Sequence, residues 1–316
     1  MRRILAAAVV LLMFATTACS SGDDKDKAGG GTKVTVGVIP IIDVAPIYLG
    51  KAKGFFARRG IDLTLVQEQG GAAIVKNVVG GKYPFGFSNV TSLMAAQAGG
   101  AKLKGVAAGV SSTGRPGRDF SAIVVHDGSP IRSAKDLAGK TIAVNTLKNL
   151  GDTTVRQSVR SDGGDPKNLK FEAMPFPDMP AALQGGRVDA AWVVEPQLSQ
   201  VLTQGGQVVA SNFVDTAADL TVALYFTSEA AVAKSPELVT HFTEAIKESL
   251  AYAATHPDEV RDIVGTYTTI NDTVRIAMIL PSWPGEINRA SIDRLAQLGR
   301  RDGILTKAPS LDQLLP

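Results

Sequence analysis

Short apolar runs alternate with amphipathic segments through the first third of the chain. The runs are rich in β-branched residues and bounded by turn residues, which is typical of strands covered on both faces. The segments between them carry apolar residues at helical spacing. This alternation predicts a mostly parallel sheet with helices on both sides. The strands are expected at 34–39, 62–66, 85–88 and 102–110, with helices near 44–58, near 71–80 and from Thr91 onward.

A second series of the same kind follows the turn-rich stretch SSTGRPGRD at 111–119. It again alternates apolar runs with helical segments, so it predicts a second α/β lobe. Its strands are expected at 122–126, 141–145, 169–175, 190–194 and 207–211, and its helices near 152–162, 179–185 and 196–204.

The pattern changes to helices alone after an apolar run at 220–227. Within 235–260, Ser235 is placed as an N-cap, and Phe242, Ile246 and Leu250 follow at four-residue steps, which gives one apolar stripe. Further helices are expected near 271–279 and 289–300. Since these helices have no sheet of their own to cover, they should return to the first lobe. We therefore expect lobe 1 at 33–115 and 216–316 and lobe 2 at 116–215, with crossings near 111–121 and 212–222.

The N-terminus carries an export signal. Arg2 and Arg3 precede an apolar run at 4–15 that is too short to span a bilayer, followed by small residues. The sequence TTAC resembles the lipobox of bacterial lipoproteins, which implies that Cys19, the single cysteine of the chain, carries a lipid. The predicted parts are a signal peptide at 1–18 and a lipidated flexible tether at 19–32, rich in Ser, Gly, Asp and Lys.

Length and charge limit the functions that the body can have. The chain has 316 residues and a formal net charge of +3. Loss of Arg2 and Arg3 with the signal peptide leaves 3 − 2 = +1. A net charge this small does not give the positive electrostatic field that a nucleic-acid-binding protein needs. The body is therefore not expected to bind nucleic acid.

Candidate chemistry lies where strands end and helices begin. In open α/β sheets, ligands bind beyond the carboxyl ends of the strands, near the free N–H groups of helix N-termini. Three junctions carry short polar residues there, which could be ordinary helix caps or could face one another across a cleft. A fourth, AAWVVEP, places an indole and a carboxylate at a strand end. The candidates are Asp43, Ser88, Asn89, Thr91, Ser92, Asn145, Thr146, Asn149, Asp152, Thr153, Trp192 and Glu195.

At these segments the chain resembles a known family. VGVIPIIDVAPIYLGKAKGFFARRGIDLTLV, GFSNVTSL, DGSPIRSAKDLAGKTIAVNTL and MPFPDMPAALQGGRVDAAWVVEPQLSQ are similar to the substrate-binding proteins of ABC importers for nitrate, sulfonate and taurine, which also include binders of thiamine-pyrimidine precursors. The resemblance implies a two-lobed periplasmic-binding-protein-like fold of type II, with a hinge and two crossovers. It also implies a ligand-binding cleft between the lobes. The residues expected to line this cleft are Pro40, Asp43, Ser88, Asn89, Val90, Thr91, Asn145, Thr146, Asn149, Asp152, Trp192 and Glu195.

The predicted function is that of a monomeric extracytoplasmic lipoprotein, anchored to the outer face of the cell membrane, that captures a small organic solute for an ABC permease. A sulfonate, a taurine-like aminosulfonate or a related zwitterion is ranked first, because helix N-termini favour an anionic group whereas Asp43 and Glu195 favour a cationic or donating one. The alternatives are a thiamine-pyrimidine-like nitrogen heterocycle and a lipoprotein that senses its ligand without transport.

An enzyme is not expected. GFSNV resembles a nucleophile elbow, but Val90 stands where the second glycine is required. AGKT at 138–141 resembles the end of a P-loop, but Ala134 stands where its first glycine belongs. His126, His241 and His256 are far apart and lack the spacing of metal ligands, so neither a metal nor a cofactor is predicted.

Overall fold

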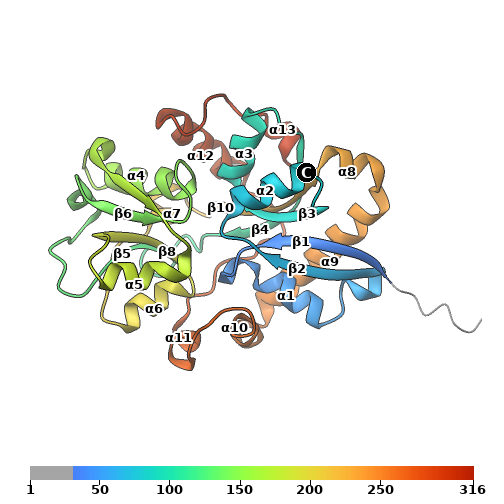
Figure 1. Ribbon diagram of the computed structural model, residues 1–316, viewed down its shortest axis with the longest axis horizontal. Coiled ribbons are helices and arrows are strands. Elements are labelled where there is room, and N and C mark those ends of the chain that lie inside the picture. The colour runs from blue at the N-terminus through green and yellow to red at the C-terminus, as the bar shows by residue number, and fades with distance from the viewer. Residues whose placement is uncertain (1–30) are drawn as a thin grey trace, which may run out of the picture. The chain divides into compact units, whose positions relative to one another are not determined.

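Two five-stranded sheets organise the part of the chain that the computed structural model describes, Gly31–Pro316 (Figure 1). The first half of the chain supplies β1 (Thr32–Val38), β2 (Ile61–Gln67), β3 (Phe85–Asn89), β4 (Leu103–Ser111) and β5 (Ser121–Val125). The remaining strands are β6 (Thr141–Val144), β7 (Lys170–Ala173), β8 (Ala190–Val194), β9 (Gln207–Ala210) and β10 (Thr221–Ser228). All ten lie within two residues of the runs predicted from the sequence.

The strand order defines two lobes. Lobe 1 is built on the order β2-β1-β3-β10-β4 and lobe 2 on the order β7-β6-β8-β5-β9. In each sheet two neighbouring pairs are parallel and two are antiparallel. The sheets are therefore mixed, whereas the sequence predicted mostly parallel ones. The physical reason is that β5 and β10, the strands that follow the crossings between lobes, each run antiparallel to both of their neighbours.

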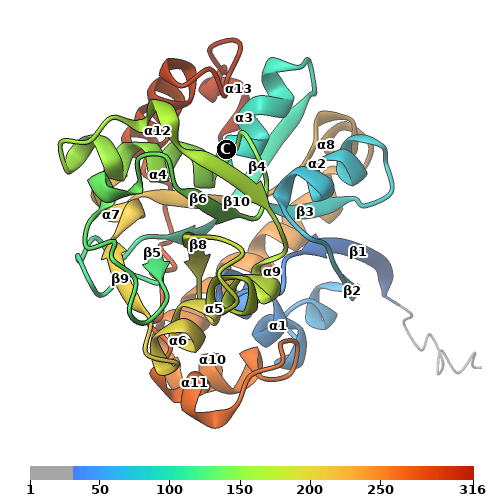
Figure 2. The same cartoon turned by 60° about the vertical axis from the view of Figure 1, so that its left-hand side comes forward.

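Helices cover both sheets (Figures 1 and 2). In lobe 1, α1 and α9 pack together while α2 and α3 pack against β3. In lobe 2, α5 and α6 pack against β8, and α7 packs against β5 and α4. The first seven helices are α1 (Ala45–Ala52), α2 (Gly71–Val79), α3 (Val90–Ala98), α4 (Leu150–Ser161), α5 (Met179–Gln184), α6 (Gln197–Thr203) and α7 (Asn212–Thr216).

The C-terminal third is mainly helical, and most of its contacts are with elements of lobe 1. There, α9 contacts β4, α12 contacts α3 and α13 contacts β4, while α11 reaches α6 of lobe 2. The helix expected at 235–260 is two helices, because Pro257 lacks the N–H that a continuous helix needs. The bounds are α8 (Glu229–Lys234), α9 (Pro236–Thr255), α10 (Pro257–Val264), α11 (Asp272–Ala277), α12 (Arg289–Arg301) and α13 (Leu311–Leu314).

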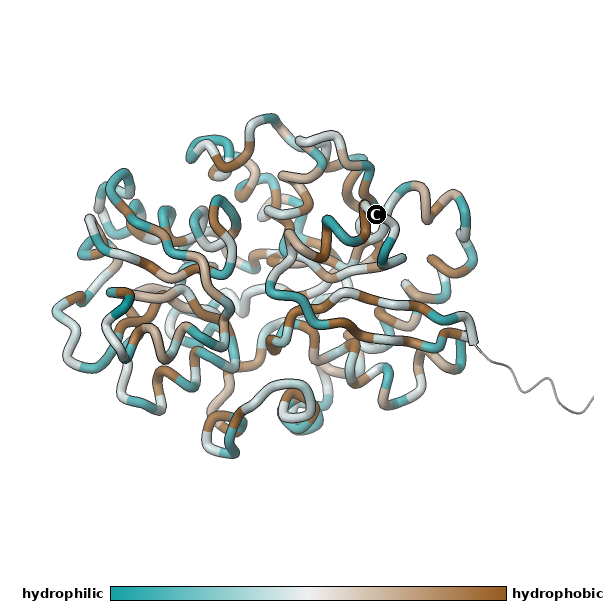
Figure 3. Tube along the Cα trace, in the orientation of Figure 1, coloured by the Kyte–Doolittle hydropathy of each residue, from teal (hydrophilic) through white to brown (hydrophobic). Residues whose placement is uncertain are grey.

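The core of each lobe lies along its strands, where the most hydrophobic stretches of the trace gather (Figure 3). The predicted stripe of α9 faces this core. Phe242 stacks on Phe85 of β3 with ring centroids 3.9 Å apart, and Ile246 and Leu250 are buried beside it. Burial of a side chain of this size contributes about 1.5–3 kcal/mol, so the stripe fixes α9 on the sheet.

Two segments join the lobes. The chain leaves lobe 1 through residues 112–120, which we call the crossing segment, and returns after α7 through residues 217–220. The two connections are bonded to each other, since the Ser112 N–H donates to the Leu220 carbonyl at 2.9 Å. The two connections therefore lie side by side, and we call this region the hinge.

Candidate functional site

A narrow crevice separates the two lobes at the carboxyl ends of β1, β3, β6 and β8. Its inner part is a cavity of about 20 Å³, and its outer part, which shares Ile39, Ile41 and Phe176 with the inner part, measures about 210 Å³. The inner part is lined by Ile39, Ile41, Asp43, Phe87, Asn89, Asn145, Leu150, Phe176, Trp192, Val194, Phe213, Val222 and Ala223. No lysine or arginine lines either part. A cavity of 20 Å³ holds about one water.

Asp43 supplies the carboxyl group of the inner cavity. It lies in a 3-10 turn (Ile42–Val44) between β1 and α1 and is 3% exposed. Its Oδ1 atom has no hydrogen-bond partner in residues 31–316. Burial raises the pKa of Asp43 to about 7, partly offset by its backbone N–H and reinforced by the negative charge of Asp119. The crevice therefore holds a carboxyl group that can accept or donate a hydrogen bond near neutral pH.

Asparagines supply the amides of the cavity, one from each lobe. Asn89 ends β3 and caps α3, because its Oδ1 accepts the Ser92 N–H at 2.9 Å. Its amide nitrogen is left for another acceptor. Asn145 directly follows β6, and both asparagines line the cavity. Two amides on opposite walls can bind one solute from both lobes at once, which favours the closed arrangement.

Trp192 forms an aromatic wall. Its indole packs edge-on against Phe176 and Phe213, with centroids 5.3 and 6.1 Å away, and its Nε1–H donates to the Ser121 hydroxyl at 2.9 Å. Gly151 of α4 makes this position possible, since a Cβ there would lie 2.4 Å from a ring carbon of Trp192. The indole nitrogen is already satisfied, so Trp192 offers an apolar face and not a donor.

Direct contacts hold the lobes together beside the crevice. Asn149, the N-cap of α4, exchanges hydrogen bonds of 2.9 and 3.2 Å with the Ser92 hydroxyl of α3. Arg160 of α4 forms an ion pair with Asp302 that follows α12, and Asp302 is 5% exposed in its side chain. These bonds join groups that the sequence placed on separate lobes; Asn149 does not line the inner cavity, and its contact with a solute stays a prediction.

Glu195 is turned away from the cavity, contrary to the expectation that its carboxylate faces a solute. The side chain is fully buried and accepts the Ser199 N–H at 3.0 Å, the Ser199 hydroxyl at 2.8 Å and the Ile279 N–H at 2.9 Å. Burial raises the pKa of Glu195 to about 7, although these hydrogen bonds act to lower it. A carboxylate with three donors has little capacity left for a ligand, so Glu195 has a structural role.

The other predicted residues lie near the cavity without lining its inner part. Pro40 lines the outer crevice. Asp152 of α4 accepts the Lys148 N–H at 3.0 Å, and burial raises its pKa to about 6. Thr146 approaches Gly70 of lobe 1 so closely that a Cβ on that glycine would lie 2.9 Å from its hydroxyl. The rest of this group, Ser88, Val90 and Thr91, is buried where β3 passes into α3.

Most of the apolar lining was missed by the sequence analysis. The signal for Phe176 was present, since this residue directly follows the strand predicted at 169–175, and Phe87 lies in the predicted strand FGFS. Phe213 belongs to α7, a helix of five residues too short to show a period. Val222 and Ala223 enter from β10, which comes from a distant part of the sequence.

Neither a membrane span nor a metal site is visible in the described residues. Within 31–316, no helix is both long and apolar enough to cross a bilayer. The same range contains no group of three or more His, Cys, Asp or Glu side chains placed to hold a metal ion. Cys19 and the predicted signal and tether fall outside that range, apart from Gly31 and Thr32.

Solved structures with this fold include bacterial import components. A ligand-binding component of an ABC-type import system from Staphylococcus aureus, with zinc bound, is 14% identical over 90% of this chain and 96% of that chain, with a TM-score of 0.77. The periplasmic aliphatic sulphonate binding protein of Escherichia coli is 18% identical over 89% and 96%, with a TM-score of 0.70. A Candida albicans protein described as having the generic periplasmic binding protein fold is 12% identical over 90% and 96%, with a TM-score of 0.71.

These likenesses confirm the α/β fold of the periplasmic binding proteins. No curated protein sequence matches the chain. The family model described as NMT1/THI5 like matches residues 41–260, which is more than half of the chain. The chain therefore belongs to the NMT1/THI5-like family.

Proposed function

We propose that the chain is an extracytoplasmic solute-binding protein that captures a small organic solute between its lobes and delivers it to an ABC importer. The observation that carries this proposal is the crevice, which takes polar groups from both lobes at the carboxyl ends of their strands. The import components and the sulphonate-binding protein that share the fold support it. We take 33–115 with 216–316 and 116–215 as the two bodies that close on the solute.

The lining favours a particular kind of solute. Asp43 suits a hydrogen-donating or cationic nitrogen, Asn89 and Asn145 suit polar oxygens or nitrogens, and the aromatic walls suit an apolar or flat body. With no cationic side chain in the crevice, a bare inorganic anion has little to bind. Since Glu195 faces elsewhere, the case for a zwitterion rests on Asp43, and an aminosulfonate and a nitrogen heterocycle fit it equally.

A thermal-shift screen tests this proposal. Taurine, an aminopyrimidine, an alkanesulfonate without nitrogen and nitrate are each added at increasing concentration. We expect a nitrogen-bearing organic solute to raise the unfolding temperature, because a ligand at 100 times its dissociation constant adds about 2.7 kcal/mol of stability. In Asp43→Asn the shift should fall. A saturable shift with nitrate that survives in Asp43→Asn contradicts the proposal.

We also propose that Cys19 anchors the protein to the outer face of the cell membrane. The support is the sequence alone: a basic start, a short apolar run and TTAC before a polar tether. We expect Cys19→Ala to move the protein from the membrane fraction to the soluble fraction, or to leave it unprocessed, when cells are fractionated. Ser20→Ala is the matched control and should stay with the membrane. Unchanged processing and membrane association of Cys19→Ala contradict the anchor.

A further inference from the structure

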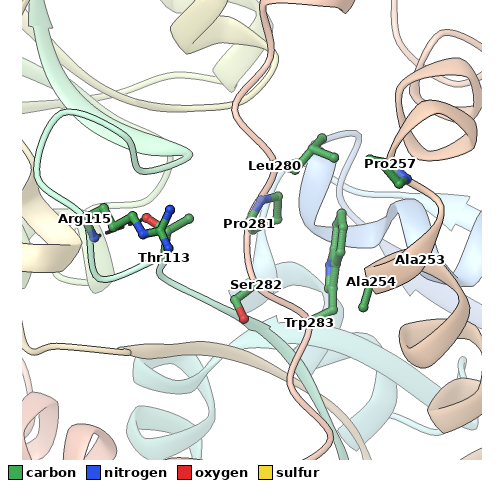
Figure 4. A pocket seen from close by; sticks show the side chains of 9 residues that line it. All are labelled: Thr113, Arg115, Ala253, Ala254, Pro257, Leu280, Pro281, Ser282 and Trp283. Atoms are coloured by element: carbon green, nitrogen blue, oxygen red, sulfur yellow. Dashed lines mark hydrogen bonds between the residues drawn. The ribbon is translucent and has the colours of Figure 1, made fainter.

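A second groove lies on the hinge side of the molecule, apart from the solute crevice. It consists of two adjoining cavities of about 350 and 580 Å³, which share Thr113, Arg115, Pro257 and Leu280. One wall is the crossing segment, and a second is the corner between α9 and α10. The third wall is residues 278–283, which we call the strap (Figure 4). No residue that lines this second groove also lines the solute crevice.

The groove carries positive charge, and its acidic neighbour is the buried Glu195, whose pKa is raised by burial and partly lowered by the charge of Arg261. Arg115 and Arg118 are exposed on the crossing segment, and Arg261 of α10 is half-buried. None of the three forms an ion pair within residues 31–316. Arg261 donates to the carbonyls of Met278 at 3.0 Å and Pro257 at 3.4 Å, which holds its guanidinium at the groove.

Each carboxylate near the groove accepts hydrogen bonds, forms an ion pair or lies beside the crossing segment. Asp119 accepts the Ser112 hydroxyl at 2.7 Å and the Thr113 N–H at 2.9 Å. Glu259 of α10 pairs with Lys53 at 2.7 Å, and Asp219 lies beside Gly114. The buried charge of Glu195 is already met by three donors. Arg115 and Arg118 therefore keep their capacity to bind an external anion, and Arg261 adds positive charge beside them.

Apolar side chains also line the groove, beside the arginines. Trp283 and Leu280 of the strap face Arg115 and Thr113 across the groove (Figure 4). Trp283 is 6% exposed, and its Nε1–H donates to the Asp43 carbonyl at 3.3 Å. Planar guanidinium groups match the oxygens of phosphate-type groups, whereas the indole and Leu280 can cover an attached organic part.

We propose that this groove is a second binding site, which takes a phosphate-type oxyanion group on Arg115, Arg118 and Arg261. The strap ties that site to both lobes. Its Ile279 N–H donates to the Glu195 carboxylate of lobe 2 at 2.9 Å, and Trp283 holds the Asp43 loop of lobe 1.

Fluorescence of Trp283 tests the site. The chain has two tryptophans, so Trp192→Phe leaves Trp283 as the single reporter. Inorganic pyrophosphate is titrated at constant ionic strength, with sodium chloride as the replaced salt. We expect a saturable change with a dissociation constant of about 1 mM or lower. Calorimetry with pyrophosphate on the unaltered protein should give the same constant, which guards against an effect of Trp192→Phe on folding.

Two matched double variants distinguish binding at the groove from a general effect of the net charge of the protein. Arg115→Gln with Arg118→Gln should weaken pyrophosphate binding at least about tenfold. Arg294→Gln with Arg300→Gln, two exposed arginines of α12, removes the same charge elsewhere and should leave the constant unchanged. No saturable change in the unaltered protein, or equal weakening in both double variants, overturns the proposal. Either result leaves the solute screen unaffected, so the two proposals fail separately.

Vesicles identify the source of the phosphate group. Protein that binds pyrophosphate but not phosphatidylglycerol vesicles takes a free phosphate compound. Binding to these vesicles and not to phosphatidylcholine vesicles, lost with Arg115→Gln and Arg118→Gln, assigns a lipid headgroup to the groove. Binding of neither pyrophosphate nor phosphatidylglycerol contradicts the site.

Discussion

Replacing Trp192 with alanine lowers the free energy of unfolding by about 3–5 kcal/mol, as measured by urea denaturation. The indole is 2% exposed and fills the space between Phe176, Phe213 and Gly151, so its removal leaves a void inside lobe 2. The Ser121 hydroxyl also loses its donor. The same change removes one wall of the crevice, so we expect solute binding to be lost.

Trp192→Phe is the matched control for this prediction. A phenyl ring keeps the packing against Phe176 but lacks the N–H that Ser121 accepts, so we expect a loss of no more than about 2 kcal/mol. A loss below about 1 kcal/mol in Trp192→Ala would mean that lobe 2 collapses into the void without cost. That outcome contradicts the packing described for this side chain.

Asp43→Asn changes how stability depends on pH. Burial raises the pKa of Asp43 to about 7 from its ordinary value of 3.8, so between these values the folded chain binds a proton that the unfolded chain has released. The contribution of Asp43 to the stability of the unaltered protein then falls as the pH rises from about 4 to about 7. An asparagine stays neutral. We expect Asp43→Asn to be more stable than the unaltered protein at pH 8, by up to about 4 kcal/mol, and to match it near pH 4.

Urea denaturation at several pH values measures this difference. Glu195 and Asp152 also have raised pKa values, so part of the pH dependence persists in Asp43→Asn. Asp293→Asn alters an exposed aspartate of α12 and should follow the unaltered protein throughout. If Asp43→Asn is less stable than the unaltered protein at pH 8, the carboxylate has a favourable partner in the folded state, and the assignment is wrong.

Periodicity identified the strands because their physical cause is local. Runs such as AAWVV and TVALYF are apolar throughout, and such a run is stable only between covering helices. Very short helices carry less information. α7 (Asn212–Thr216) and α13 (Leu311–Leu314) extend over one turn or slightly more, too little for an apolar stripe to repeat. They are held by tertiary packing, which the local sequence does not show.

The candidate site was predictable in position but not in orientation. Strand ends located Asp43, Asn89, Asn145 and Trp192, and these side chains do line the cavity; that they contact a solute stays a prediction. Glu195 follows a strand in the same way, yet its partner Ile279 lies 84 residues further along the chain. Ser199, four residues further on, supplies two of the three donors and is visible in the local sequence, whereas the third donor, Ile279, is not.

The position of β10 has a consequence for the order of folding. This strand lies between β3 and β4 in the sheet of lobe 1, although all of β5–β9 precedes it in the chain. The sheet of lobe 2 is contiguous in sequence, from Ser121 to Ala210. As closure of a long loop costs entropy before its contacts form, lobe 2 should assemble first and lobe 1 last. Until β10 arrives, β3 has an open edge and β4 has no partner in the sheet, which makes the half-folded chain prone to aggregation.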